Sequence, residues 1–451
     1  MPTQHDPAQT AASSQRIIPR RALACLALPA VVGLALTGCS TSGSSPSSGG
    51  AEVSGDTVTV DSSACPPDAT AALADGADIV VGTSLAMSGP ASSSAVTLGG
   101  ANAYFDKVNA AGGVDGHKIR FETKDDALDP ARAVANVKSL IEQDKVFATI
   151  LQLGTPQSQA TRAMYEKNCV PQLYVSSGAP DFYDPAAHQW STSNFLPYEV
   201  WGQATVDYLT KTFPQGAKIG ELVWNSDTGK ASSTALSEAI KGGNATVVAQ
   251  TTHDSTAVSL SNQTGEILAA SPDVIVASTG GAFCTQLVSE ARRAGFKGPI
   301  MMPLACRDTT QFFEPLGDLA TNVLAVRSSL DPASTRDAEN ADVKTYLADM
   351  AAFQPSANAR STYVADGYRF AALLVEQLGR AAKSEAGLTR AALMDAVWST
   401  DTNLAMNFDG NKVVVNGARP YPVGNGTVLS YDASAKSWTD TGVDVVAGAG
   451  Q

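Results

Sequence analysis

Histidine is scarce in this sequence. Four occur among 451 residues, with no two close together: His5, His117, His188 and His253. A metal site built on histidine is therefore not indicated. The chain also lacks the HExxH, GxSxG and P-loop motifs, and no GxGxxG follows a predicted strand. These absences weigh against an enzyme, and no cofactor or metal is expected.

Charged residues are also few, at 17% of the chain, and the formal net charge is −13. Nucleic-acid partners select basic surfaces, so this acidic balance argues against them. The neighbouring carboxylates Asp125 and Asp126 do not indicate an acid–base pair, because adjacent residues on a strand point to opposite faces. We interpret them as local capping groups together with Asp129. A chain of 451 residues is too long for one core and predicts two domains.

The amino-terminal region lacks an apolar run long enough to span a membrane. The run Ala22–Leu36 has 15 residues, whereas a spanning helix needs about 20. Three arginines precede it, as in a signal peptide: Arg16, Arg20 and Arg21. It ends in Leu36-Thr37-Gly38-Cys39, which resembles the lipobox of bacterial lipoproteins. We predict a signal peptide over residues 1–38 and lipid on Cys39, with a plain signal peptide or a buried core helix as the alternatives.

The segment after Cys39 has the composition of a flexible linker. Ser40–Gly50 is made of serine, glycine, threonine and proline and has no side chains to bury. Residues 39–77 are therefore predicted to be a lipidated tether, with Ala51–Gly76 as a weakly structured approach to the fold. A lipid anchor and a tether place the folded part at the outer face of the cytoplasmic membrane.

Four cysteines remain after the signal peptide and Cys39. They are Cys65, Cys169, Cys284 and Cys306. An even number in an exported chain predicts two disulfides, for which three pairings exist. We favour Cys284–Cys306, which lie in one predicted sub-domain, and this leaves Cys65–Cys169. Free buried thiols are the alternative.

Strand and helix patterns alternate in two regions, Asp78–Val175 and Ala217–Arg327. One unit shows the signals clearly: a helical stripe over Ala101–Ala110, a stop at Gly112–Gly113, and an alternating strand over Lys118–Lys124. Such alternation predicts an α/β fold with two Rossmann-like parallel-sheet domains. The end of the chain, Leu404–Thr441, reads as β-rich, with a turn at Asn425-Gly426.

Several loops that follow predicted strands combine glycine with small hydroxyl residues. Open parallel sheets bind ligands beyond the carboxyl ends of their strands, so these loops are candidate binding loops. Thr155 is predicted to be a helix N-cap with Pro156 at the first helical position, which would leave the amides of Gln157 and Ser158 free for a carboxylate. The alternative is that Thr155 only caps its own helix. The loops are Ser88-Gly89, Gly154-Thr155, Ser176-Ser177-Gly178, Asp227-Thr228-Gly229 and Ser278-Thr279-Gly280-Gly281.

Residues 78 to about 430 resemble a known family. The stretches VGTSLAMSGP, NAAGGVDGHKIRFETKDDALDPARAV, GTPQSQATRAMYEKNCVP, YVSSGAP and SEARRAGFKGPI are similar to those of branched-chain amino acid (Leu/Ile/Val-type) substrate-binding proteins of ABC transporters, which have the periplasmic binding protein type I fold. The resemblance implies two lobes, joined by three hinge segments, that close on a solute. Lobe one would be residues 78–194 plus 328–403, and lobe two would be residues 195–327 plus 404–441.

The resemblance also implies roles for individual residues. Thr155 and the loop Ser176–Gly178 fall where the family holds the ligand carboxylate, and Leu153 and Tyr363 fall where apolar side chains line the pocket. Near Ala282-Phe283, where some amino-acid binders have a glutamate for the ammonium group, this chain has no acid, and Asp227 is a candidate substitute. Thr228 stands where many relatives have tyrosine. The expected ligand-binding set is Ser88, Leu153, Gly154, Thr155, Ser176, Ser177, Gly178, Tyr198, Asp227, Thr228, Gly281, Phe283 and Tyr363.

The expected function is capture of a small polar solute, an amino acid or a related compound, for an ABC permease in the membrane. We expect a monomer that is not an enzyme. A sensory receptor of the same fold and an exported hydrolase are the alternatives. A hydrolase would need an acid–histidine pair in a pocket, for which only His188 and His253 are candidates. His253 lies beside Asp254, and we interpret it as a surface residue.

Overall fold

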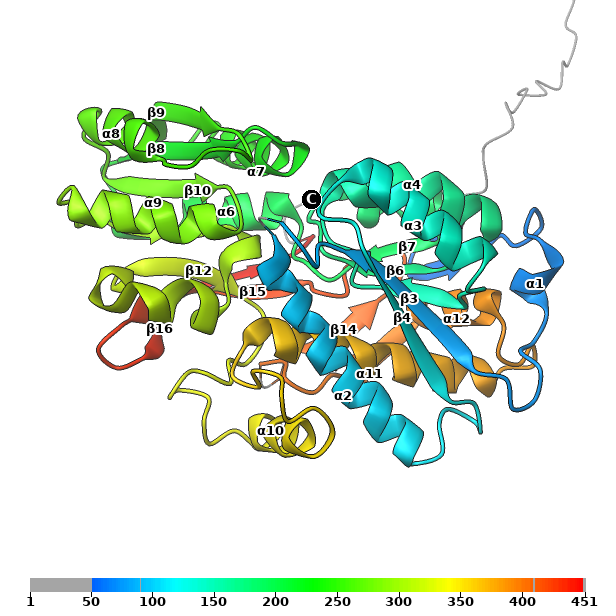
Figure 1. Ribbon diagram of the computed structural model, residues 1–451. Helices are drawn as coiled ribbons and strands as arrows, with labels where there is room; N and C mark the ends of the chain where they lie inside the picture. Colours follow the sequence, from blue (N-terminus) through cyan, green and yellow to red (C-terminus); the bar gives the residue numbers. More distant parts are fainter. Residues whose placement is uncertain (1–50, 90, 409, 449–451) are drawn as a thin grey trace, which may run out of the picture. The chain divides into compact units, whose positions relative to one another are not determined.

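Two β-sheets, each flanked by helices, make up most of the computed structural model, which describes residues 51–89, 91–408 and 410–448 (Figure 1). The predicted signal peptide, Cys39 and Ser40–Gly50 lie outside the described residues. Among the described residues, no helix is both long and apolar enough to cross a membrane. The predicted α/β fold with two mainly parallel sheets is confirmed.

The first sheet has five strands in the order β4-β3-β5-β6-β7, and every pairing is parallel. Its interior strand β3, between β4 and β5, is buried along its whole length, as expected for a strand covered on both faces. The strands are β3 (Ile79–Leu85), β4 (Ile119–Asp125), β5 (Ala148–Ile150), β6 (Gln172–Val175) and β7 (Ser191–Ser193).

Helices cover both faces of this sheet (Figure 1). Helix α2 packs along α11, and α3 packs along α4. The interior side chains of α11 include Phe370, Leu373 and Leu374, all with no exposed surface. Burying each such side chain contributes roughly 1.5–3 kcal/mol to folding. The helices are α2 (Thr97–Ala110), α3 (Pro130–Glu142), α4 (Thr155–Asn168), α10 (Ala341–Phe353), α11 (Thr362–Ala382) and α12 (Arg390–Trp398), with short turns η1 (Ser92–Val96), η2 (Pro180–Phe182) and α5 (Pro185–His188).

The helix–turn–strand unit predicted around Gly112–Gly113 is confirmed. Helix α2 ends at Ala110, and strand β4 begins at Ile119. Gly113 has φ +89°, and a Cβ there would lie 2.0 Å from the carbonyl oxygen of His117, so only glycine fits this turn. Asp129 caps α3, because its Oδ1 accepts a hydrogen bond of 2.9 Å from the amide of Arg132.

The second sheet has seven strands in the order β16-β15-β12-β11-β10-β8-β9. The five strands from β12 to β9 are parallel, whereas β15 and β16 add an antiparallel edge. The predicted turn at Asn425-Gly426 is wrong, because these residues begin β15. The strands are β8 (Ala217–Trp224), β9 (Ala245–His253), β10 (Val274–Ser278), β11 (Ile300–Met301), β12 (Val323–Arg327), β15 (Asn425–Asp432) and β16 (Ser437–Val446).

The second sheet also carries helices between its strands. They are α6 (Tyr198–Thr212), α7 (Asp227–Ala239), α8 (Ser261–Ala269) and α9 (Ala282–Arg293), followed by the short helical segments η3 (Leu304–Cys306), η4 (Thr309–Phe313) and η5 (Glu314–Ala320). A separate antiparallel pair, β13 (Thr400–Asn403) and β14 (Lys412–Val415), precedes β15. Helices α6 and α7 pack together on this sheet.

The chain passes between the two sheets three times. It leaves the first sheet after β7, returns after β12 to form α10–α12, and reaches the second sheet again at β15. These passages match the three hinge segments that the resemblance implies. We propose to keep the predicted boundaries, so lobe one denotes residues 78–194 plus 328–403 and lobe two denotes residues 195–327 plus 404–441.

The segment before the first sheet is ordered, although the sequence indicated a weakly structured approach. It forms the hairpin β1 (Glu52–Ser54) and β2 (Thr57–Thr59) and the short helix α1 (Pro67–Thr70). We call residues 51–77 the amino-terminal clasp. The expectation of little structure is wrong because long-range partners, rather than local patterns, hold this segment.

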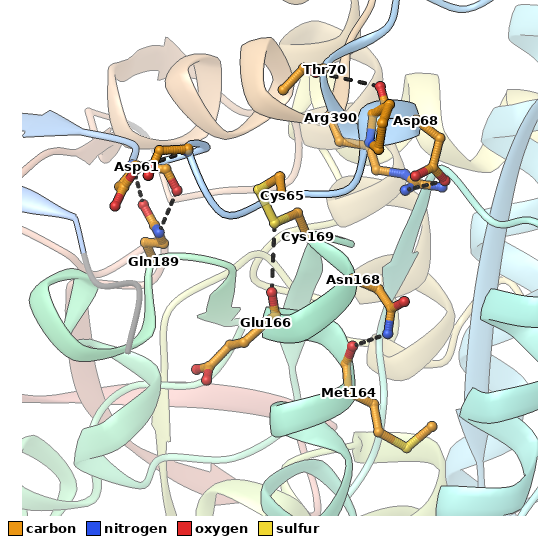
Figure 2. Close-up of a disulfide and its surroundings, with 12 residues drawn as sticks. Asp61, Cys65, Asp68, Thr70, Met164, Glu166, Asn168, Cys169, Gln189 and Arg390 are labelled. Carbon is orange, nitrogen blue, oxygen red and sulfur yellow. Dashed lines mark hydrogen bonds and ion pairs between the residues drawn. A yellow bond between two sulfur atoms is a disulfide. The ribbon is translucent and has the colours of Figure 1, made fainter. Parts of the chain in front are cut away.

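A disulfide fastens the clasp to the end of α4 (Figure 2). Cys65 and Cys169 are bonded, with Cα atoms 5.6 Å apart and a sequence separation of 104. Beside this bond, Arg390 Nη1 lies 3.1 Å from Asp68 Oδ2 and joins the clasp to α12 (Figure 2). The second disulfide, Cys284–Cys306, links α9 to η3. The structure therefore has the pairing that the sequence favoured.

Candidate ligand-binding site

A cavity of about 380 Å³ lies where the loops at the carboxyl ends of both sheets meet. Lobe one contributes the loops after β3, β4, β5 and β6, and lobe two contributes the loops after β8, β9, β10 and β11. Large apolar side chains form much of the wall, namely Leu85, Leu128, Leu151, Leu153, Phe195, Tyr198, Trp224, Phe312 and Tyr363. Apolar walls with a few polar groups are typical of small-molecule sites.

Seven of the thirteen residues expected to bind ligand line this cavity. Four come from lobe one or its helix α11, and three come from lobe two or the segment that enters it. The structure thus brings together side chains that lie up to 210 residues apart in sequence, from 153 to 363. They are Leu153, Gly154, Ser176, Tyr198, Thr228, Gly281 and Tyr363.

The other six expected residues do not line this cavity. Ser88 donates from its hydroxyl to Asp125 Oδ2 at 2.6 Å, and Phe283 packs on His253 with ring centroids 4.3 Å apart. Gly178 lies under the ring of Tyr198, where a Cβ would come within 2.6 Å of Cδ1. Asp227 lines a second, separate hollow instead, together with Thr155. Ser177 is fully buried.

Thr155 is not the N-cap of its helix. Gly154 takes that place with φ +98°, and Thr155 and Pro156 occupy the first turn. The Thr155 hydroxyl instead forms a 2.7 Å hydrogen bond with Ser177 Oγ, which ties α4 to the loop after β6. The N-cap prediction for Thr155 is wrong for two reasons. Gly154 adopts the positive φ that the chain needs at the N-cap position, and the hydroxyl of Thr155 bonds Ser177 instead of its own helix.

The start of α4 borders the cavity. Gln157 lines the cavity and lies in the first turn of α4, where backbone amides have no carbonyl partner within the helix. The amide of Ser158, expected to be free, donates to the carbonyl oxygen of Gly154 at 3.1 Å. The positive end of the helix therefore remains a suitable place for an anion, with one of the two expected amides already engaged.

Sequence reasoning missed a charged pair in the cavity wall. Arg307 Nη2 lies 2.6 Å from Asp366 Oδ2, and both side chains are at most 10% exposed. Arg307 follows strand β11 and η3, so it lies beyond the carboxyl end of a parallel strand, where ligands are expected. Sequence reasoning did not select it because β11 is only two residues long. Asp366 lies within α11, one turn beyond Tyr363, and no local pattern marks it. Asp366, rather than Asp227, is the carboxylate of the lining.

His253 is buried, so its interpretation as a surface residue is wrong. Its side chain is 3% exposed, and Nε2 lies 2.6 Å from the hydroxyl of Thr279, which lines the cavity. Desolvation by burial lowers the pKa of His253 below its ordinary value. The other histidine that we considered, His188, lies 2.6 Å from Glu166 Oε1, and neither residue lines the cavity.

Metal ligands do not gather anywhere in the part of the chain that the structure describes. No group of three or more histidine, cysteine, aspartate or glutamate side chains is arranged to hold an ion among residues 51–89, 91–408 and 410–448. The polar groups of the cavity are hydroxyls, amides and the Arg307–Asp366 pair, which suit recognition of a small organic solute.

Comparison with known proteins gives a match over most of the chain. Residues 78–413 match a family model described as "Periplasmic binding protein". An amino acid binding protein of Pseudomonas aeruginosa is 37% identical over 79 residues, which are 16% of this chain and 20% of that protein. The Leu/Ile/Val-binding protein of Escherichia coli is 28% identical over 172 residues, 38% and 46% of the two chains. The matches thus span less than half the length of these relatives.

A solved structure shows the same fold. A branched chain amino acid ABC transporter protein of Thermus thermophilus, with bound valine, superposes with a TM-score of 0.74. The superposition covers 83% of this chain and 98% of that one, at 15% sequence identity. At this identity the likeness concerns the fold.

Proposed function

The chain belongs to the family of periplasmic binding proteins, and we propose that it is the solute-binding lipoprotein of an ABC importer. The observation that carries the proposal is the cavity, whose wall is built from post-strand loops of both lobes. A solute in this cavity touches both lobes at once. It therefore binds the closed arrangement more tightly than an open one and shifts the population toward closure.

The chemistry of the wall supports an amino acid or a related small compound as the solute. The apolar side chains suit a hydrocarbon portion, and the first turn of α4 suits a carboxylate. The relatives named above as amino acid binding and Leu/Ile/Val-binding proteins agree with this assignment. We propose that Leu153, Tyr198 and Tyr363 contact the apolar portion and that Gln157 and Ser176 lie near the acidic group.

The proposal includes a lipid anchor on Cys39. The lipobox Leu36–Cys39 and the tether Ser40–Gly50 support it, and both lie outside the described residues. A Cys39→Ser variant expressed in a bacterium that lipidates its exported proteins is expected to move from the membrane fraction to the soluble fraction. Fractionation followed by immunoblotting measures this, and an unchanged membrane fraction would contradict the anchor.

A thermal-shift screen of the mature protein tests the ligand class. Amino acids, amides and small carboxylic acids would each be added in excess, because binding to the folded form stabilises it by mass action. A true solute at about a hundredfold excess over its Kd adds roughly 2.7 kcal/mol. We expect a raised Tm with at least one aliphatic amino acid. A flat response to the whole panel would exclude this class of solute.

A further inference from the structure

Thr279 and His253 form a fixed unit in the lobe-two wall of the cavity. Thr279 follows β10 and lines the cavity, and its hydroxyl lies 2.6 Å from His253 Nε2 at the end of β9. Trp224 stacks on the histidine ring at an interplanar angle of 11°, and Phe283 packs against it. Both rings hold the imidazole in place, so the hydroxyl of Thr279 has a preorganised partner.

The surroundings of His253 determine which of its nitrogens carries hydrogen. Nδ1 lies 3.1 Å from the carbonyl oxygen of Asp254, and a carbonyl oxygen only accepts, so Nδ1 is the donor. Burial lowers the pKa of His253 and so favours the neutral ring. A neutral imidazole has one N–H, and Nε2 is therefore an acceptor. The hydroxyl of Thr279 must donate to it.

Because the proton of Thr279 is used inside the protein, its oxygen has only lone pairs left to offer. We propose that Thr279 is a specificity-determining residue that accepts a hydrogen bond from the solute, so that the solute presents an N–H or O–H donor to lobe two. This inference rests on the proposed function and specifies the direction of one hydrogen bond between the protein and the solute. His253 is then a positioning residue, which acts through Thr279.

Two other groups of the lining show the same polarity. The hydroxyl of Tyr363 donates to the carbonyl oxygen of Ala305, which leaves its oxygen as an acceptor. The buried Oδ1 of Asn194 has no hydrogen-bond partner among the described residues, and a buried acceptor of this kind requires a donor. The wall therefore offers acceptors at several places, as a solute rich in donors requires.

Nitrogen-15 NMR of the full chain labelled at histidine tests the assignment without any solute. We expect His253 to show a protonated Nδ1 and an unprotonated Nε2 at pH 7. A His253→Gln variant identifies its signals by their loss. Protonation of Nε2 instead of Nδ1 would overturn the inference, because Thr279 would then keep its own proton for the solute.

Binding measurements with three matched probes test the consequence. L-Leucine has an ammonium donor, 2-hydroxy-4-methylpentanoate has a hydroxyl donor, and 4-methylpentanoate has neither. We expect each donor-bearing probe that binds to have an affinity roughly tenfold or more above that of 4-methylpentanoate. The reason is that 4-methylpentanoate leaves the buried acceptor of Thr279 unpaired, which is costly. Thr279→Val should remove this preference, whereas Thr279→Ser should keep it.

The outcomes separate the inference from the proposed function. A Thr279→Val variant that keeps the wild-type preference would overturn the inference while the solute class stands. Failure of all three probes to bind would contradict the amino-acid class, and the NMR measurement would still decide the direction of the Thr279–His253 hydrogen bond.

Discussion

An Asp366→Asn variant is expected to lower the free energy of unfolding by about 3 to 5 kcal/mol, the typical cost of removing one partner of a buried ion pair. The Asp366 side chain is 7% exposed and lies 2.6 Å from Arg307 Nη2. It also lies 3.6 Å from Arg369 Nε, and that side chain is 3% exposed. Desolvation lowers the pKa of Arg369 to about 10, so it stays charged at pH 7. Asparagine would leave two buried guanidinium groups without this carboxylate.

Urea unfolding of the mature protein measures this loss, and the chain offers a matched control. Asp401 pairs with Lys412 at 2.7 Å, but their side chains are 61% and 51% exposed. Because solvent screens such a pair, Asp401→Asn should cost no more than about 1 kcal/mol. Equal losses of unfolding free energy in the two variants would show that the Arg307–Asp366 pair is not shielded from solvent, and would contradict the prediction.

Removing the Cys65–Cys169 bond by a Cys65→Ala/Cys169→Ala double variant is expected to lower the free energy of unfolding by about 2 to 5 kcal/mol. The bond closes a loop with a sequence separation of 104, and in the chain-entropy model longer loops contribute more. It also holds the clasp, which precedes the residues matched by the family model, against lobe one. Solute affinity should change little, because neither cysteine lines the cavity.

The second disulfide provides the comparison for this prediction. Cys284–Cys306 has a sequence separation of only 22, so the same model assigns it a smaller contribution. It joins α9 to η3, directly before Arg307, so its loss should disturb the cavity wall. Its loss should also lower the free energy of unfolding by less than the loss of Cys65–Cys169 does. Denaturant unfolding of the two double variants in parallel checks the order. A larger destabilisation from the shorter loop would contradict it.

The elements that the sequence predicted well are those set by neighbouring residues. The stop at Gly112–Gly113 and the cap at Asp129 depend on glycine conformation and on a carboxylate close to free amides, both visible in a few residues. Thr155 shows where such rules fail. Its hydroxyl could bond the start of its own helix or Ser177, 22 residues away in sequence, and it bonds Ser177.

The parts of the site that sequence reasoning missed depend on contacts between distant segments. Arg307 and Asp366 are 59 residues apart and meet only because η3 and α11 face the same cavity. His253 has the local context of a surface residue, beside Asp254 at a strand end, but Trp224 and Phe283 cover it. The clasp likewise gains its order from Cys169 and Arg390, far along the chain.

Calorimetric titration of two tryptophan variants with the solute identified by the thermal-shift screen tests the central claim, that both lobes enclose one solute. Leu153→Trp fills the cavity from lobe one, and Thr228→Trp fills it from lobe two. Lys230→Trp, on the exposed side of the same helix α7, is the matched control. We predict that both cavity variants lose at least about tenfold in affinity while the control binds as the wild type does. Wild-type affinity in either cavity variant, with the protein folded, would contradict a site shared by the two lobes.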